Sequence, residues 1–439
     1  MSARDGALRA SARILQRQRE RIPRFLLVLA VVIYASLGFV APLLSPHRLD
    51  FAINYSAATL VRTHGGDIYD WGDLERVHQE RIGSAPDFDQ LYKSTFTSYV
   101  SPPTTAILLL PLSLLPFSVA SVVFLLVSNG LFLWSVLLLL RSLKTPLRSP
   151  AANLALRCML PFYPLFVSFF LGQMDSIVIL ALTLALCAAL QRRDARAGAW
   201  LMLAAVIKVS PLLVLGFFVA RRRWSALVGS AAAGILGGLV TLAVVGARTA
   251  LHFATHVLPV VGKGSAFFEN QSLLGMMYRF ALPREAIMSL DAMEDYPTVR
   301  LLWIGSSIVL LAVTFELVRR AKLQDRPLSA IAFGVFIVAG LLTGAITWDH
   351  YTTWALLPLG ALIIDWAETR WVSPTSFWTL LLTAWSLLLF PDVLQVLLYD
   401  IVGRGASSLG TYGLLVLLGL MWWRLARAIP ARIPAAQAI

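Results

Sequence analysis

Charged residues and cysteines are scarce in this chain. Only 14% of its 439 residues are Asp, Glu, Lys or Arg, whereas a typical soluble protein contains about 25%. The two cysteines, Cys158 and Cys187, each lie within an apolar run. They give neither the spacing of a zinc site nor enough thiols for a disulfide framework. These shortages exclude a disulfide-rich secreted domain and argue against a water-soluble enzyme.

Long apolar runs take the place of the missing charge. Hydrophobic residues make up 58% of the chain, and the mean hydropathy is +0.74. A stretch such as "FLLVLAVVIYASLGFVAPLL" has the roughly 20 apolar residues that a helix needs to cross a bilayer. We therefore predict an all-α polytopic membrane protein with about twelve transmembrane helices. The predicted spans are 25–44, 101–116, 118–140, 153–171, 173–190, 198–219, 225–246, 299–318, 328–346, 352–366, 374–391 and 408–425.

The net charge of +13 has a simpler explanation than nucleic-acid binding. The basic residues stand at the ends of apolar runs, as the positive-inside rule requires, and anionic lipid headgroups attract them. We expect membrane lipids as partners and no nucleic acid. The predicted organisation is a basic cytoplasmic tail (1–24), a single transmembrane domain (25–425) and a second cytoplasmic tail (426–439).

The location predicted from this pattern is the cell membrane, crossed many times, with both termini cytoplasmic. Two basic clusters, 141–148 and 192–196, conflict with a twelve-span count because they fall on the outer side. Either these loops break the rule, or one of the runs between 118 and 190 is re-entrant.

Two long hydrophilic segments, 45–100 and 247–298, fall on the outer face in this count. Loops of this length in a compact protein usually have a function. The first has a helical pattern that is broken at Gly65–Gly66, and we expect it to form amphipathic helices along the membrane surface. The active site is expected in these two outer loops.

Lys208, in "AAVIKVSP", is predicted near the middle of an apolar span. An ionised lysine at mid-bilayer costs roughly 2.5–3.5 kcal/mol on insertion scales. Lys208 therefore either forms an internal ion pair or binds an anion such as phosphate.

Asp50 follows the first apolar run and allows three interpretations. It is a solvated acid at a helix end, a metal ligand, or a general base that deprotonates a hydroxyl. No DxD, ExxH or HxxxH pattern accompanies it, so a divalent metal is not expected. His350, beside Asp349 and Tyr351, is either a packing residue or part of the same site.

Five short motifs, taken together, resemble glycosyltransferase family 87. They are an Asp-Phe followed by Tyr and Ala-Ala from Asp50, "SYVSPP" at 98–103, the Gly172–Gln173 pair, Lys208 followed by Ser-Pro, and the Asn-Gln-Ser at 270–272. The resemblance covers residues 25–420 and implies a GT-C glycosyltransferase fold. Enzymes of this kind use a polyprenyl-phosphate sugar as donor and need no further cofactor.

The resemblance also implies roles for individual residues. Asp50 would be the catalytic general base, in an inverting displacement on the extracytoplasmic face. The donor phosphate would be held by Lys208, Arg279 and His350. Substrate would be positioned by Tyr55, Tyr99, Gln173, Asn270, Gln271, Asp349 and Tyr351. The sugar would be mannose or, second, arabinofuranose, and the acceptor a glycolipid or a cell-envelope glycan.

Two other classes of protein remain open from the residues alone. A secondary transporter places polar residues near mid-membrane, as predicted for Lys208, although no matched pair of interrupted helices is visible. In a non-catalytic lipid-binding protein, Asp50 would be a surface acid.

Overall fold

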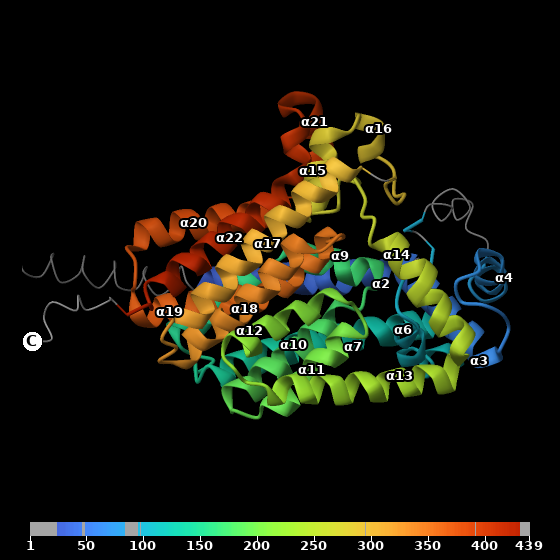
Figure 1. Ribbon diagram of the computed structural model, residues 1–439, viewed down its shortest axis with the longest axis horizontal. Helices are drawn as coiled ribbons and strands as arrows, with labels where there is room; N and C mark the ends of the chain where they lie inside the picture. Colours follow the sequence, from blue (N-terminus) through green and yellow to red (C-terminus); the bar gives the residue numbers. More distant parts are fainter. Residues whose placement is uncertain are drawn as a thin grey trace, which may run out of the picture.

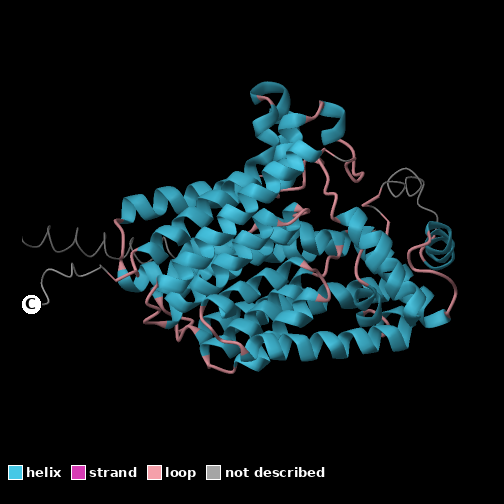
Figure 2. Cartoon of the chain, viewed as in Figure 1, coloured by secondary structure: helices cyan, strands magenta, loops and turns pink. Residues whose placement is uncertain are grey.

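The computed structural model describes residues 24–45, 49–83, 95–96, 98–294, 296–390 and 392–430, and within these ranges its regular elements are helices (Figures 1 and 2). In chain order they are η1 (Tyr34–Val40), α2 (Ala41–Leu44), α3 (Leu49–Thr63), α4 (Trp71–Arg81), α6 (Pro103–Leu108), η2 (Leu112–Leu114), α7 (Phe117–Ser142), α8 (Pro150–Met159), α9 (Tyr163–Leu171), α10 (Asp175–Leu190), α11 (Asp194–Ala205), η3 (Ser210–Val214), α12 (Leu215–Ala220), α13 (Ser225–His252), η4 (Phe253–Val257), α14 (Leu258–Val261), α15 (Leu273–Ala281), α16 (Arg284–Ile287), α17 (Pro297–Arg320), α18 (Arg326–Thr343), η5 (Asp349–Ala355), α19 (Leu356–Thr369), α20 (Pro374–Leu389), α21 (Asp392–Val402), η6 (Arg404–Ser408) and α22 (Leu409–Ala426).

Six helices are long and apolar enough to cross a membrane, and a seventh span results if the bent pair α8–α9 counts as one. The six are Arg24–Leu44, Phe117–Ser142, Ser225–Val261, Pro297–Arg320, Arg326–Thr343 and Arg404–Ala426. The protein is thus a multi-pass membrane protein, as predicted. Figure 1 shows the long helices running side by side along the long axis, while α15, α16 and α21 project from one side.

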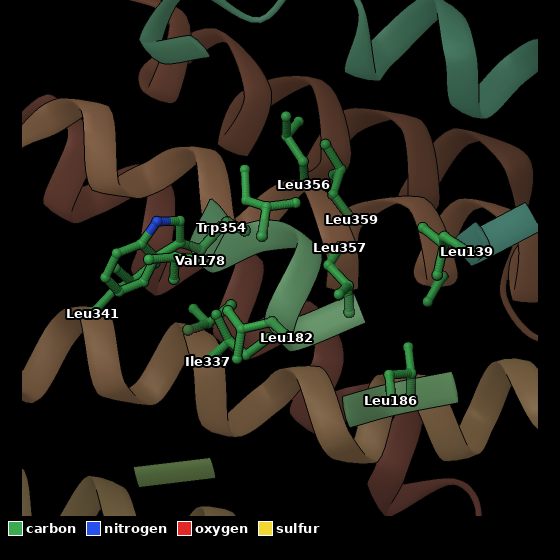
Figure 3. Packing of buried hydrophobic residues seen from close by; sticks show 14 of the residues in the cluster. Leu139, Val178, Leu182, Leu186, Ile337, Leu341, Trp354, Leu356, Leu357 and Leu359 are labelled. Carbon is green, nitrogen blue, oxygen red and sulfur yellow. The ribbon is translucent and has the colours of Figure 1, made fainter. Parts of the chain in front are cut away.

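The centre of the bundle is formed by α18 and α19. Every residue of α18 from Pro327 to Thr343 is buried except Ser329. Figure 3 shows Ile337 and Leu341 of this helix within a cluster that also contains Leu182 of α10, Trp354 and Leu357. The outer helices α13 and α17 instead expose aliphatic side chains such as Val228 and Leu301. In a membrane these side chains face lipid, which costs nothing there.

Close backbone contact joins α11 to α13. A Cβ atom added to Gly198 would lie 1.8 Å from the carbonyl oxygen of Ala226, so only glycine permits this approach. The Ser230 hydroxyl donates to the Gly198 carbonyl across the same contact, at 2.9 Å. Small residues let membrane helices pack in this way, because burial of apolar surface does not hold helices together within lipid.

Three predicted spans differ in the structure, and one of them, 153–171, is bent by 53° between α8 and α9. Residues 101–116 form only the short elements α6 and η2, so this run is not one continuous helix. The run 198–219 doubles back, because α11 ends at Ala205 and the chain restarts as η3 at Ser210. A lysine near a Ser-Pro pair suits such a break, since proline removes a backbone donor and the ammonium needs polar partners.

This change also resolves the conflict over the basic loops. Arg192, Arg221, Arg223 and Arg326 line one cavity, and the Arg326 guanidinium donates to the carbonyl of Ser142 at 2.8 Å. The loops after α7, α10, α12 and α17 therefore meet at one end of the bundle. No loop has to break the positive-inside rule, and no run between 118 and 190 has to be re-entrant.

The first long hydrophilic segment matches its prediction in part. The helical pattern breaks where expected, because α3 ends at Thr63 and Gly66 has a φ of 150°. The prediction that the segment before this break is a surface helix is wrong. All residues of α3 from Phe51 to Val61 are buried, so α3 is part of the core, whereas α4 is largely exposed.

A buried ion pair ties α22 to α19. The Arg424 guanidinium donates twice to the Asp365 carboxylate, at 2.6 and 3.0 Å. The Asp365 side chain is fully buried, and that of Arg424 is 10% exposed. Two parallel bonds satisfy both charges, and either charge alone would be left unpaired in an apolar setting.

We therefore expect Asp365→Asn to destabilise the protein strongly, by about 3–5 kcal/mol, because it leaves the Arg424 charge buried without a counter-charge. Thermal unfolding in detergent would measure the loss. The matched control is Glu316→Gln, whose partners Arg319 and Arg320 are exposed, and it should change little. Equal melting temperatures for the two variants would contradict this account.

Candidate active site

Asp50 stands in the first turn of α3. The positive end of the helix dipole favours a carboxylate at this position. The Asn54 amide donates to the Asp50 carbonyl oxygen at 2.7 Å, which holds the turn. The Gln173 amide nitrogen donates to Asp50 Oδ2 at 2.5 Å. Asp50 is therefore fixed by a partner 123 residues away in the sequence.

Gln173 comes from the corner between α9 and α10. Gly172 ends α9 in the left-handed conformation, with φ 72° and ψ 45°, where a side chain would be strained. The Gln173 backbone N–H then donates to the Ser168 carbonyl at 2.9 Å. The sharp corner directs Gln173 toward Asp50 and lets α10 begin at Asp175. This is the physical reason for the Gly-Gln pair in the sequence.

Lys208 lies in the break between α11 and η3, and not within a span. Its ammonium donates to Gln173 Oε1 at 3.1 Å and lies 3.6 Å above the centre of the Tyr351 ring. Asp175 Oδ1 is 3.9 Å away. Of the two interpretations of Lys208, the internal ion pair is present, and its contact with Gln173 also links it to Asp50.

Asp175 anchors this arrangement although its side chain is fully buried. The Ser168 hydroxyl donates to Asp175 Oδ2 at 2.9 Å, and the Trp354 indole donates to Oδ1 at 3.0 Å. A buried carboxylate with two donors and a nearby ammonium is satisfied. Asp175 therefore orients Lys208 from behind.

The 3-10 helix η5 brings three further residues to the site. The Asp349 carboxylate accepts the His350 backbone N–H at 2.6 Å and lies 3.4 Å from His350 Nδ1. The His350 ring packs edge-on against Tyr351, and Tyr351 stacks on Trp354. His350 is only 2% exposed. Among the described residues neither ring nitrogen has a hydrogen-bond partner, which is unusual for a buried histidine.

We call Asp50, Gln173, Asp175, Lys208, His350 and Tyr351 the Asp50 cluster. Burial raises the pKa of Asp50, while the charge of His350, the Gln173 hydrogen bond and the charge of Lys208 lower it. A carboxyl with a raised pKa is a stronger base than an exposed one.

Glu269 reaches this site from the loop 265–272. The loop is pinned to the strand-like segment before η5, because the Gln271 N–H donates to the Thr347 carbonyl at 2.6 Å and the Thr347 N–H donates to Asn270 Oδ1 at 2.8 Å. Burial, then the charges of Asp349 and Asp50, raise the pKa of Glu269 to about 8. Glu269 is thus the fourth carboxyl group of this region, after Asp50, Asp175 and Asp349.

Five predicted site residues are placed elsewhere, with their polar groups engaged by protein. The Tyr55 hydroxyl donates to the Leu115 carbonyl at 2.8 Å. The Tyr99 hydroxyl donates to the Pro102 carbonyl and accepts the Ala106 N–H, at 2.9 and 3.0 Å. Both rings pack within buried clusters, a role that does not match substrate positioning.

The other three, Asn270, Gln271 and Arg279, are buried supports of the loop 265–272. The Arg279 guanidinium donates to the carbonyls of Phe267 and Asn270 at 3.0 and 2.7 Å, and twice to the Ser408 hydroxyl. These bonds hold the Arg279 guanidinium in place within the protein, and its predicted binding of the donor phosphate stays a prediction. The side-chain amides of Asn270 and Gln271 likewise form hydrogen bonds with backbone groups.

An apolar groove opens beside Lys208 and Tyr351. Its volume is about 400 Å³, and apart from these two side chains its walls are almost entirely apolar. They come from residues just before α6, the break at 207–213, Phe253 of η4, α14 with Gly262, and the segment 344–348. A ligand that fits has one anionic end near Lys208 and a hydrocarbon chain along the groove.

Comparison with known proteins agrees with this geometry. The model of glycosyltransferase family 87 matches residues 99–343, which is more than half of the chain. The chain belongs to glycosyltransferase family 87. The matched region contains Gln173, Lys208 and Glu269, whereas Asp50 and His350 lie outside it.

Three curated relatives are named as polyprenol-phosphate-mannose-dependent mannosyltransferases. The chain is 29% identical over 267 residues to a polyprenol-phosphate-mannose-dependent alpha-(1-2)-phosphatidylinositol pentamannoside mannosyltransferase of Mycolicibacterium smegmatis, covering 60% of each chain. Polyprenol-phosphate-mannose-dependent alpha-(1-2)-phosphatidylinositol mannoside mannosyltransferases of M. smegmatis and Mycobacterium tuberculosis are 24% and 25% identical, over 59% and 60% of this chain. The matches span about 60% of the length of these relatives.

Sequence reasoning missed Asp175 and Glu269 as members of the site. Asp175 follows Gly172–Gln173 within an apolar region, and Glu269 directly precedes Asn270–Gln271. The sequence did offer one indication, because each of them is close in the chain to a residue that was predicted to be in the site. Within the described residues, no group of three or more His, Cys, Asp and Glu side chains is arranged to hold a metal ion, and the expectation of no metal stays a prediction.

The raised pKa of Glu269 makes a prediction about stability. Its ordinary value is 4.5 and its folded value is about 8, so its stabilising effect is complete below the first value and is lost as the pH rises through the second. We expect the melting temperature of the wild type to fall more steeply across this window than that of Glu269→Gln. Glu285→Gln, an exposed acid nearby, should behave as wild type. Identical slopes for all three proteins would show that Glu269 is not held protonated.

Proposed function

We propose that this family 87 protein transfers a mannosyl group from polyprenyl-phosphate mannose to a glycolipid acceptor. The observation that carries the proposal is the Gln173 amide, which bonds both the Asp50 carboxylate and the Lys208 ammonium beside an apolar groove. A base and a phosphate-binding cation are thereby held side by side at the polar end of a lipid-sized groove. The names of the relatives support both the donor and the type of acceptor.

The reaction is a single displacement. The acceptor hydroxyl oxygen attacks the anomeric carbon of mannose while Asp50 takes the hydroxyl proton. The bond between that carbon and the phosphate oxygen breaks, and polyprenyl phosphate leaves with the electron pair. The configuration at the anomeric carbon inverts, so a β-linked donor gives an α-linked product.

The leaving phosphate gains negative charge as the bond breaks, and fixed positive groups lower the barrier to this step. Lys208 is held for this purpose by Gln173, Asp175 and the Tyr351 ring. His350 is a second candidate, because both of its ring nitrogens are buried and neither has a hydrogen-bond partner among the described residues.

The orientation in the membrane is also part of the proposal. The basic loops gather at the end of the bundle away from the Asp50 cluster, and by the positive-inside rule that end is cytoplasmic. Both termini would then be cytoplasmic and the active site extracytoplasmic. With α11 and η3–α12 counted as separate passes and 101–116 omitted, about twelve passes fit a GT-C fold.

Asp50→Asn tests the base. We expect kcat for mannose transfer to fall by about 10²–10⁴-fold, the usual contribution of a general base. The assay is transfer of radiolabelled mannose from polyprenyl-phosphate mannose to phosphatidylinositol mannosides by protein in lipid. The control is Glu80→Gln, an exposed acid on α4, which should retain full activity. Wild-type rates for Asp50→Asn would move the base to another carboxyl, and transfer only from an arabinofuranosyl donor would change the sugar.

Leu258→Trp tests the groove. Leu258 lines the groove and is 38% exposed, so an indole there would obstruct a polyprenyl chain. We expect KM for a long-chain donor to rise about tenfold, since one displaced isoprene unit is worth more than 1.4 kcal/mol, while a short-chain donor is less affected. Leu251→Trp, in the same spanning helix but outside the groove, should change neither value. Equal effects on both donors would place the hydrocarbon chain elsewhere.

A further inference from the structure

A second cavity, of about 230 Å³, lies at the opposite end of the bundle from the Asp50 cluster. Two helices connect the two places. Helix α10 begins at Asp175 in the cluster and ends at this cavity, 16 residues or about 24 Å away. Helix α18 begins at the cavity and ends just before the groove. The cavity is therefore distinct from the proposed active site.

Four arginines line this cavity: Arg192, Arg221 and Arg223 in the loops after α10 and α12, and Arg326 at the first residue of α18. We call it the arginine pocket. The arginines are not brought together by closeness in the sequence, because they follow three different helices, α10, α12 and α17. Each loop alone would satisfy the positive-inside rule with its arginines spread over the surface.

Protein groups fix three of these side chains in place. Arg223 is paired with Asp194, with Nε 2.9 Å from Oδ2. Arg221 Nη1 donates to the carbonyls of Val318 and Ala321, each at 3.1 Å. Arg326 Nη1 donates to the Ser142 carbonyl, as described above. Carbonyl groups orient a guanidinium but leave its charge uncompensated.

The balance of charge in the arginine pocket is positive. Among the described residues that line the pocket, the acid is Asp325, one oxygen of which caps the start of α18 by accepting the Leu328 N–H at 2.7 Å. Asp194, outside this lining, is paired with Arg223, so the guanidinium groups of the pocket outnumber these two carboxylates. Burial, and then the charges of Arg192 and Arg223, lower the pKa of Arg221, so these cations repel one another.

Arg192 is held in an unfavourable backbone conformation. Its φ is 60°, a region that glycine adopts more easily than arginine. Its side chain has no hydrogen-bond or ion-pair partner among the described residues. Arg222 has the same type of backbone, with a φ of 52°, and is exposed, but it does not line the pocket.

We propose that the arginine pocket binds the phosphate group of an anionic ligand, in the form of a phospholipid headgroup or free phosphate. Guanidinium groups bind phosphate oxygens in pairs of parallel hydrogen bonds, and converging arginines from several loops suit that geometry. An anion would also relieve the repulsion among the four cations.

The surroundings favour the lipid as the source of the phosphate. Phe217, the end of α10 and Leu323 give the pocket an apolar wall. Trp224, next to Arg223 in the sequence, is 56% exposed, as is typical of a residue at the level of lipid headgroups. Basic pockets between helices at the cytoplasmic side of membrane proteins bind anionic headgroups.

The test compares Arg192→Gly with Arg222→Gly. Each variant removes one positive charge and relieves the same kind of backbone strain, and only the first removes a cation from the pocket. The protein is placed in phosphatidylcholine nanodiscs with and without phosphatidylglycerol, and retained phosphatidylglycerol is counted by native mass spectrometry. We expect retention affinity to fall roughly tenfold for Arg192→Gly, the effect of losing one charge-assisted contact, and less than about twofold for Arg222→Gly.

A second arm identifies the source. Sodium phosphate is added at constant ionic strength to protein in phosphatidylcholine, and the melting temperature is compared with that in sodium chloride. Stabilisation by phosphate that is lost only in Arg192→Gly would identify free phosphate as a ligand. Retention of phosphatidylglycerol without this stabilisation would identify the headgroup.

The proposal is overturned if the two variants lose phosphatidylglycerol equally, because the arginines would then act only as a diffuse basic surface. It is also overturned if the wild type retains no phosphatidylglycerol and gains no stability from phosphate. Melting temperatures of both variants in phosphatidylcholine alone should equal or exceed that of the wild type, which excludes misfolding as the cause. No measurement here depends on sugar transfer, so the result is independent of the proposed function.

Discussion

The need to satisfy one ammonium group in an apolar bundle shapes the region around Lys208. An unpaired lysine charge that is largely buried among apolar side chains would be strongly unfavourable. In the structure, Gln173, Asp175 and the face of the Tyr351 ring stabilise the Lys208 ammonium. To bring these partners together, the chain must break between α11 and η3 and must turn sharply at Gly172. The same features that stabilise the charge therefore create a polar site beside a lipid-accessible groove.

A second layer of residues supports the first without facing the groove. Arg279, Asn270 and Gln271 spend their hydrogen bonds on backbone carbonyls and N–H groups of the loop 265–272 and its neighbours. The loop in turn carries Glu269 toward Asp349 and Asp50. Rigid support of this kind holds reacting groups in position more effectively than extra contacts with substrate would. Polar residues that are neighbours in the sequence therefore have different roles: Glu269 lies at the candidate site, whereas Asn270 and Gln271 hold the loop in place.

Two groups of charged side chains lie at opposite ends of the buried helices α10 and α18. Carboxylates, Lys208 and His350 meet at one end, and arginines meet at the other. Helices α10 and α18 run between them, and both are buried for nearly their whole length. In both places, water, lipid headgroups or groups of opposite charge can stabilise the charged side chains.

The sequence by itself determined the class of protein, its helical content and the family, because apolar runs and local motifs are properties of neighbouring residues. It also identified Asp50, Gln173, Lys208, Asp349, His350 and Tyr351, since a polar residue in an apolar region is costly wherever it is placed. Only the tertiary structure decided that 198–219 doubles back, that Tyr55, Tyr99 and Arg279 are engaged by protein groups, and that Asp175 and Glu269 lie beside the candidate site. Local patterns could not show this, because a side chain's role depends on which hydrogen-bond partners distant segments bring within about 3 Å of it.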